Sequence, residues 1–233
     1  MAGLYKNAPL VNTAFESRFF GDLSIEARRD QFQRAIRADF PKLYVPNAAL
    51  GTAPALQHYQ FRNDDNSTRV SLAVNSFVYA TSSYAGFESF KVELEKYRRL
   101  FNEHFGIRSF TRLGLRYTNH LPIIRNDSGA IPLSKYVTAS LKVAKEFPSE
   151  HINDVSLGMS CKMAGGDLRL LMQTEQRDGG LEVLSLDFDF SRRGALDSDE
   201  IPEFLETAHK EIEALFLDLI SEDYKEIMRG GTK

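Results

Sequence analysis

The chain has 233 residues, of which 42% are hydrophobic and 26% are charged, and its formal net charge is −3. These values favour one large folded domain or two small ones over a disordered chain. Neither basic nor acidic residues show the large excess that is typical of proteins that bind nucleic acids or membrane surfaces. No apolar run approaches the ~20 residues that cross a bilayer, and the first residues lack the apolar stretch of a signal peptide. We therefore expect a cytoplasmic protein with no membrane partner.

In the first part of the chain, apolar residues recur either at every second position, which predicts strands, or at three- and four-residue spacing, which predicts helices. The expected elements are a strand over Pro9–Phe20, a helix over Ile25–Asp39 capped by Ser24, a hairpin of His58–Arg62 and Arg69–Tyr79, and a helix over Phe87–Phe105. Gly106 suits the position after the last helical turn.

The second part repeats this plan with one more strand. The expected elements are a strand over Arg112–Leu121, a helix over Pro132–Lys145, three strands over Ile152–Met163, Leu168–Gln176 and Leu181–Phe190, a long helix after Asp197-Ser198, and a short last turn capped by Ser221.

The order of elements is βαββα followed by βαβββα, so residues 1–106 and 107–233 share a plan. Hairpins and short links favour antiparallel pairing. We predict an α+β fold in which a mostly antiparallel, seven-stranded sheet carries its helices on one face. No Pro-rich or Gly/Ser-rich linker separates the halves, and we therefore expect 1–233 to form a single compact domain with pseudo-twofold character.

Two strands carry the residues that invite a chemical interpretation. Arg112, Arg116 and His120 lie on one side of their strand, and Asp187 and Asp189 lie on the polar side of theirs. The arginines suit a carboxylate or phosphate ligand, whereas the aspartates could hold a cation or serve as general acid and base. The alternative for both sets is that they are the polar face of an amphipathic strand, where they form ion pairs with one another or simply meet water.

Two further residues belong to the candidate set. Asn119 shares the apolar side of its strand, so we expect it to be buried and to need hydrogen-bond partners. His209 borders the apolar stripe of the last long helix, which favours a boundary residue over a catalytic one. The candidate binding residues, expected in a polar cleft between the halves, are Arg112, Arg116, Asn119, His120, Asp187, Asp189 and His209.

Other chemistry has little support in the sequence. The single cysteine, Cys161, excludes an internal disulfide, and we expect it to be a buried, inert thiol in a strand. The nucleotide-binding, metalloprotease and serine-hydrolase motifs are absent from the sequence. We assign no catalytic residue, no metal ligand and no cofactor.

Several short landmarks, taken together, resemble a sporadically distributed family of prokaryotic proteins of about this length, whose function is uncharacterised. The landmarks span nearly the whole chain: Pro9-Leu10, Phe40-Pro41, Tyr84, Gly86-Phe87, Phe90, the segment Arg112–Tyr117 with Asn119, Asp187–Asp189, Ala208-His209 and Phe216. The chain departs from the family pattern at Phe87, where Trp is common, and at Ser221-Glu222, where Thr-Asp is common. The resemblance brings no known reaction, and it implies an accessory gene of the host-defence or toxin–antitoxin type.

Two functions remain open at this point. The first is a non-enzymatic binding or partner subunit, with a protein partner, a homodimer or a small anionic ligand, and with no nucleic-acid partner expected. The alternative is a metal-assisted hydrolase or nuclease that uses Asp187 and Asp189 with His209. The second function requires these three side chains to converge in an open pocket.

Overall fold

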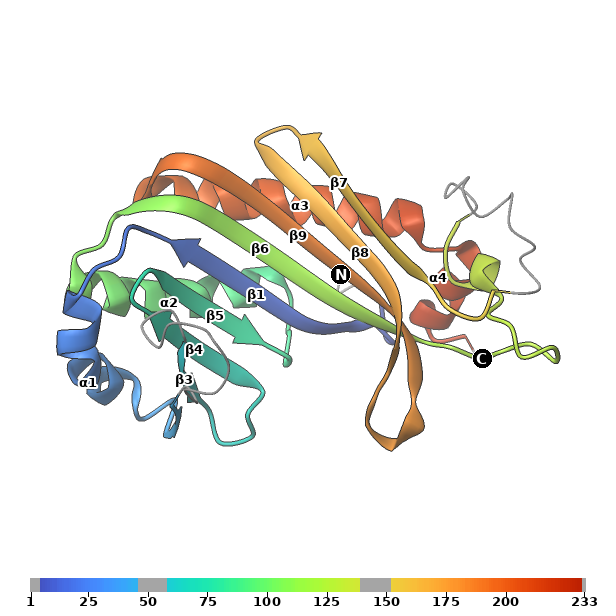
Figure 1. Ribbon diagram of the computed structural model, residues 1–233, viewed down its shortest axis with the longest axis horizontal. Coiled ribbons are helices and arrows are strands. Elements are labelled where there is room, and N and C mark those ends of the chain that lie inside the picture. Colours follow the sequence, from blue (N-terminus) through green and yellow to red (C-terminus); the bar gives the residue numbers. More distant parts are fainter. Residues whose placement is uncertain (1–4, 46–57, 139–151, 232–233) are drawn as a thin grey trace.

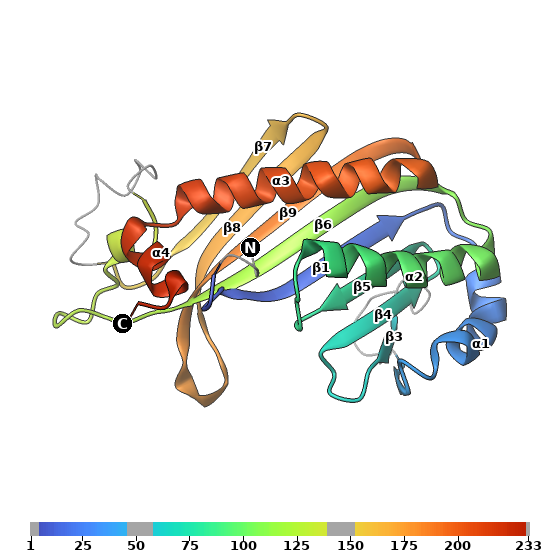
Figure 2. The ribbon, with the colours of Figure 1, turned by 180° about the vertical axis from the view of Figure 1, so that it is seen from behind.

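A computed structural model describes residues 5–45, 58–138 and 152–231. These residues form an α+β fold in which long helices lie on one face of a nine-stranded antiparallel sheet (Figures 1 and 2). The strand order is β2-β3-β4-β5-β1-β6-β9-β8-β7. The α+β class and the antiparallel sheet are confirmed, whereas the expected number of seven strands is too low.

The elements of the two halves are as follows. The first half contains β1 (Leu10–Arg18), α1 (Ser24–Ile36), β2 (Lys42–Tyr44), β3 (Tyr59–Arg62), β4 (Thr68–Ala73), β5 (Ser76–Thr81) and α2 (Phe87–Phe105). The second half contains β6 (Ser109–Pro122), β7 (Ser156–Met163), β8 (Gly166–Gln176), β9 (Glu182–Asp197), α3 (Ile201–Leu219) and α4 (Glu222–Arg229). Short 3₁₀ turns lie at Leu133–Lys135, Asp178–Gly180 and Ser198–Glu200.

The sheet has the same arrangement on either side of its central strand pair. Outward from the centre, one side runs β1-β5-β4-β3 and ends with the short β2, and the other runs β6-β9-β8-β7. In each half the first strand lies at the centre, the last strand lies beside it, and a long helix follows the last strand. Because β1 and β6 pair with each other antiparallel, the sheet continues without interruption from one half to the other.

The two long helices cover one face of the sheet, as Figure 2 shows, and α1 packs beside α2 at one end. The apolar residues of α2 recur at helical spacing and are buried: Phe87, Phe90, Leu94, Tyr97, Phe101 and Phe105. Gly106 ends α2 with φ 72°, a left-handed conformation that residues with a side chain rarely adopt. The face of the sheet away from α2 and α3 is called the open face below.

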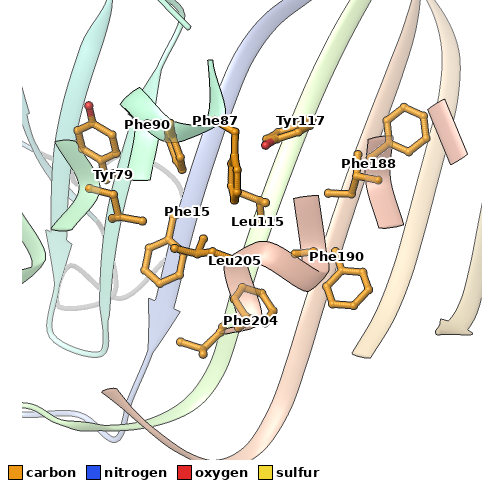
Figure 3. Close-up of a cluster of buried hydrophobic side chains, with 14 of the residues drawn as sticks. Phe15, Tyr79, Phe87, Phe90, Leu115, Tyr117, Phe188, Phe190, Phe204 and Leu205 are labelled. Atoms are coloured by element: carbon orange, nitrogen blue, oxygen red, sulfur yellow. The ribbon is translucent and has the colours of Figure 1, made fainter. Parts of the chain in front are cut away.

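Phenylalanine dominates the interface between helices and sheet (Figure 3). Phe188 of β9 meets Phe216 of α3 with 6.1 Å between ring centroids, and Phe77 of β5 meets Phe101 of α2 at 5.0 Å. Buried residues of both halves belong to one continuous apolar cluster. Since this chain has no tryptophan, tilted and edge-on phenylalanine pairs fill the space between the layers.

The prediction of one strand over Arg69–Tyr79 is wrong, because β4 and β5 are separate strands joined by a turn at Val74-Asn75. Alternation of apolar and polar residues holds from Val70 to Asn75 and then shifts by one position, because Phe77 and Tyr79 take over the apolar places. The turn has no glycine or proline to mark this break. The edge strand β2 was also missed, since three residues are too few to show a period.

Two further local predictions need correction, and one is confirmed. The helix expected over Pro132–Lys145 is described only as far as residue 138, and this part contains a 3₁₀ turn at Leu133–Lys135 and no α-helix; residues 139–151 lie outside the described part of the chain. Ser24 does not cap α1 with its side chain; its backbone N–H instead donates to Asp22 Oδ1 at 2.7 Å. Ser221 does cap α4, and its side chain accepts a hydrogen bond from the Tyr224 N–H.

Candidate functional site

The open face collects the polar side chains of the central strands. Side chains alternate between the two faces of a sheet, and residues that pair across strands share a face. Arg112 and Arg116 of β6 therefore share the open face with Asp187 and Asp189 of the adjacent strand β9. Glu16 of β1 joins them from the other side of β6.

These five residues form a network of ion pairs. Arg112 donates from Nη1 to Glu16 Oε2 at 2.6 Å, and from Nη2 to both carboxylate oxygens of Asp189 at 2.8 Å. Arg116 donates to Asp187 through Nε at 2.6 Å and through Nη2 at 2.5 Å. The bonds to Asp187 raise the pKa of the Arg116 guanidinium, which therefore stays charged. The two aspartates thus hold arginine, in agreement with the ion-pair alternative.

A glycine makes room for this network. A Cβ atom at Gly114 would lie 2.3 Å from Arg112 Nη1 and 2.9 Å from Arg112 Cζ. The guanidinium of Arg112 therefore lies flat against the backbone of its own strand, in the space that a side chain at position 114 would fill. From there it reaches Glu16 on one side and Asp189 on the other.

His120 lies further along the open face, outside this network. Its Nε2 lies 2.7 Å from Nη2 of Arg177, and Arg177 forms an ion pair with Glu175. Burial lowers the pKa of His120, and the nearby positive charge of Arg177 lowers it further. The imidazole is therefore held in its neutral form beside an arginine, at a distance from the two aspartates.

Asn119 and His209 lie on the helix-covered side of the sheet. Asn119 is fully buried, as expected, and its Nδ2 reaches the carbonyl oxygen of Leu186 at 3.5 Å, while its Oδ1 has no hydrogen-bond partner in the described residues. The His209 ring stacks on Phe87 with 3.9 Å between centroids. The candidate residues therefore do not share one cleft between the halves: five lie on the open face of a continuous sheet, and two lie on its other side.

A chain of hydrogen bonds connects His209 with two tyrosines. The hydroxyl of Tyr117, which is 0% exposed, lies 3.0 Å from His209 Nδ1 and 3.4 Å from the hydroxyl of Tyr84. Burial raises the pKa of both tyrosines and lowers that of His209, so all three groups are neutral at neutral pH. The sequence indicated that Tyr117 faces the core, but no spacing connected it with Tyr84 or His209.

Three cations that form no ion pair with a described residue lie on the open face near the β7 edge of the sheet. Lys162 of β7, Arg169 of β8 and Arg193 of β9 line a surface groove of about 440 Å³. Two carboxylates, Asp167 and Asp189, also line it, so the cations exceed the anions by one. None of the three cations has an ion-pair partner among the described residues. We call this the β7–β9 groove. No local sequence pattern predicts this groove, because it depends on how three strands align.

The lone thiol lies beside the β7–β9 groove. Cys161 is exposed, so the expectation of a buried thiol is wrong. It belongs to the outermost strand of the sheet, whose outer edge pairs with no other strand in the described residues. Apolar residues at every second position predicted the strand correctly but did not show that it lies at the edge.

Within the described residues, no group of side chains forms a centre for a metal ion. No three His, Cys, Asp or Glu side chains in the described ranges are grouped closely enough to hold one. Among the helices of those ranges, none has the length and apolar character to cross a membrane. Asp187 and Asp189 do not converge with His209, because the sheet lies between them.

No known protein family matches this chain, and no curated protein is similar to it in sequence. The resemblance drawn from the short landmarks therefore stays a prediction. Several of those landmarks are nevertheless in contact in the fold: the ring of His209 stacks on Phe87, and Tyr117 lies between His209 and Tyr84. The function must be inferred from the geometry of the site.

Proposed function

We propose that this chain is a non-enzymatic binding subunit that recognises an acidic, extended segment of a partner protein along the β7–β9 groove. The observation that carries the proposal is the convergence of Lys162, Arg169 and Arg193 on one groove, none of them with an ion pair in the described residues. Arginine and lysine in such a position favour carboxylate ligands.

The neighbourhood of the groove favours a peptide over a small anion. β7 ends the sheet, so its outer edge offers backbone N–H and C=O groups that an added strand can pair with. A strand that pairs with β7 places alternate side chains on the open face, where the three cations lie. Glutamate or aspartate at those alternate positions would then meet Lys162, Arg169 and Arg193.

The charges at the centre of the sheet support binding rather than catalysis. Asp187 and Asp189 are both held by two hydrogen bonds from arginine, which leaves neither as a general base or as a metal ligand. The landmark resemblance leads us to propose a prokaryotic accessory system, of the defence or toxin–antitoxin type, as the setting of this subunit.

Titration of the protein with a hexaglutamate peptide, followed by calorimetry, tests the proposal. We expect Arg169→Gln and Arg193→Gln each to weaken binding about two- to fivefold, the range for partly exposed ion pairs. Hexaglutamine, which has the same length and no charge, should bind far more weakly. The matched control is Arg99→Gln on α2, which removes an exposed arginine from the other side of the sheet.

Three results would contradict the proposal. One is an absence of hexaglutamate binding at low salt. Another is an equal loss of affinity in the Arg99→Gln control, which would show a dependence on net charge alone. The third is tighter binding of a short DNA duplex than of the peptide, which would replace the acidic protein partner with a nucleic acid.

A further inference from the structure

A second pocket lies on the helix-covered side of the sheet, between the first turns of α2 and the ends of β4 and β5. Its volume is about 200 Å³, the space of roughly seven water molecules at about 30 Å³ each, so it suits a ligand smaller than a drug molecule. Both β4 and β5 contribute to its floor, and Glu93 and Phe90 of α2 line it from above. We call it the α2 pocket.

The sequence explains why this space is not filled. Thr68 and Thr81 pair directly across β4 and β5, and their hydroxyls bond to each other at 3.0 Å. On the same side of the sheet, the next pair along these strands is Val70 with Tyr79, which packs under α2. The threonine pair is therefore smaller than the neighbouring pair, which contains Tyr79. The space between the threonines and α2 stays unfilled.

A tyrosine hydroxyl that bonds to none of the described residues lines the α2 pocket. Tyr79 is 3% exposed, and its hydroxyl makes no hydrogen bond to any described residue. Figure 3 shows this hydroxyl pointing away from the apolar cluster that holds the ring. The ring is buried while the hydroxyl is accessible from the pocket, so a molecule bound there can supply the hydrogen-bond partner that the described residues do not.

The charge of the pocket is negative. Two carboxylates, Asp39 and Glu93, are among its lining residues, which include no lysine and no arginine. Asp39 already binds Lys96 Nζ at 2.8 Å and the Tyr97 hydroxyl at 3.1 Å. Glu93 has no ion pair in the described residues, and its charge is close enough to contribute to the raised pKa of Tyr79.

Next to the α2 pocket, a lysine of the chain is already bound by a carboxylate and a tyrosine ring. The rings of Tyr79 and Tyr97 stack, with 5.7 Å between centroids and 23° between planes. The ammonium group of Lys96 lies 5.0 Å from the centroid of Tyr97 while it bonds to Asp39. Tyr79 and Glu93 offer the same two groups, a tyrosine and a carboxylate, beside this arrangement, but no lysine of the described residues forms an ion pair with Glu93.

We propose that the α2 pocket binds a small organic cation with a primary ammonium group, which bonds to the Glu93 carboxylate and the Tyr79 hydroxyl. The apolar part of the ligand lies against the rings of Phe40 and Phe90, which also line the pocket. Aromatic rings and carboxylates together favour organic cations, because the ring faces are negative. This site goes beyond the proposed function, since it lies on the other side of the sheet from the β7–β9 groove.

Calorimetric titration at pH 7 with two probes of nearly equal shape, benzylammonium and neutral benzyl alcohol, tests this site. We expect benzylammonium to bind at least about tenfold more tightly than the alcohol, as one charge-assisted hydrogen bond implies. Glu93→Gln should remove most of this difference. Tyr79→Phe should weaken benzylammonium binding about threefold and leave the thermal unfolding transition cooperative.

The matched control is Glu103→Gln, which removes an exposed carboxylate from α2 outside the pocket and should leave the affinity unchanged. Equal affinities for the two probes, an unchanged affinity in Glu93→Gln, an equal loss in Glu103→Gln, or no binding of benzylammonium would each overturn the proposal. The hexaglutamate titration of the opposite face is independent, so either proposal can fail while the other stands.

Discussion

Gly114→Ala tests the ion-pair network on the open face. The new Cβ would lie 2.3 Å from Nη1 of Arg112, so the guanidinium must leave the strand surface. Because it is the far end of a flexible side chain, it can move without displacing the backbone. It would then lose its bonds to Glu16 and Asp189.

The expected change in the free energy of unfolding depends on how exposed the ion-paired side chains are. The side chain of Arg112 is 11% exposed and those of its partners are 20% and 34% exposed, which places both pairs toward the upper end of the range for surface ion pairs. Two such pairs contribute about 1–2 kcal/mol. Alanine in a strand interior is favoured over glycine by about 0.5–1 kcal/mol, so the net destabilisation is about 0–1.5 kcal/mol.

A double-mutant cycle measured by urea unfolding distinguishes this mechanism from ordinary crowding. In an Arg112→Ala background there is no guanidinium to displace, so Gly114→Ala should stabilise the protein by about 0.5–1 kcal/mol. The effect of Gly114→Ala on the free energy of unfolding should therefore differ by about 1–2 kcal/mol between the two backgrounds. Equal destabilisation in both backgrounds would refute the role assigned to Gly114.

Two other predictions concern the buried polar groups. Tyr117→Phe removes the hydroxyl that bonds to His209 and Tyr84, and it should lower the free energy of unfolding in urea by about 1–2 kcal/mol; an unchanged value would show that the buried chain contributes nothing. Burial is the main cause that lowers the pKa of His58, His120 and His209, so the unfolded chain binds more protons between their folded pKa values and about 6.5. The contribution of these histidines to the free energy of unfolding should therefore be fully present above about pH 6.5 and decrease as the pH falls below that value. The decrease should be smaller in His209→Gln. A urea midpoint that rises between pH 7.5 and pH 5.5 would contradict this sign.

The sequence predicted α2 and the central strands because each shows one period over its whole length. Prediction failed where a turn without glycine or proline only shifted the pattern by one residue, as at Val74-Asn75, and where an element was too short to show a period, as in β2. The period therefore located the elements more reliably than it located their ends.

For the candidate site, the sequence held more information than its interpretation used. His209 borders the apolar stripe of α3, and the aspartates lie on the polar side of β9, so the two belong to opposite faces of the sheet. The β7–β9 groove and the Tyr84–Tyr117 contact depend on strand register and helix docking between distant segments. No local pattern encodes either of them.

The central pairing of β1 with β6 has a consequence during protein synthesis. Because β1 leaves the ribosome long before β6, the nascent first half can complete β1-β5-β4-β3 and α2 while the outer edge of β1 has no partner. Such an edge invites pairing with another chain, and here it persists until the second half emerges. The residues of β1 pair with residues of β6 that lie about a hundred positions downstream: Thr13 with Tyr117, Phe15 with Leu115 and Ser17 with Leu113. This large sequence separation makes the last step of folding inherently slow.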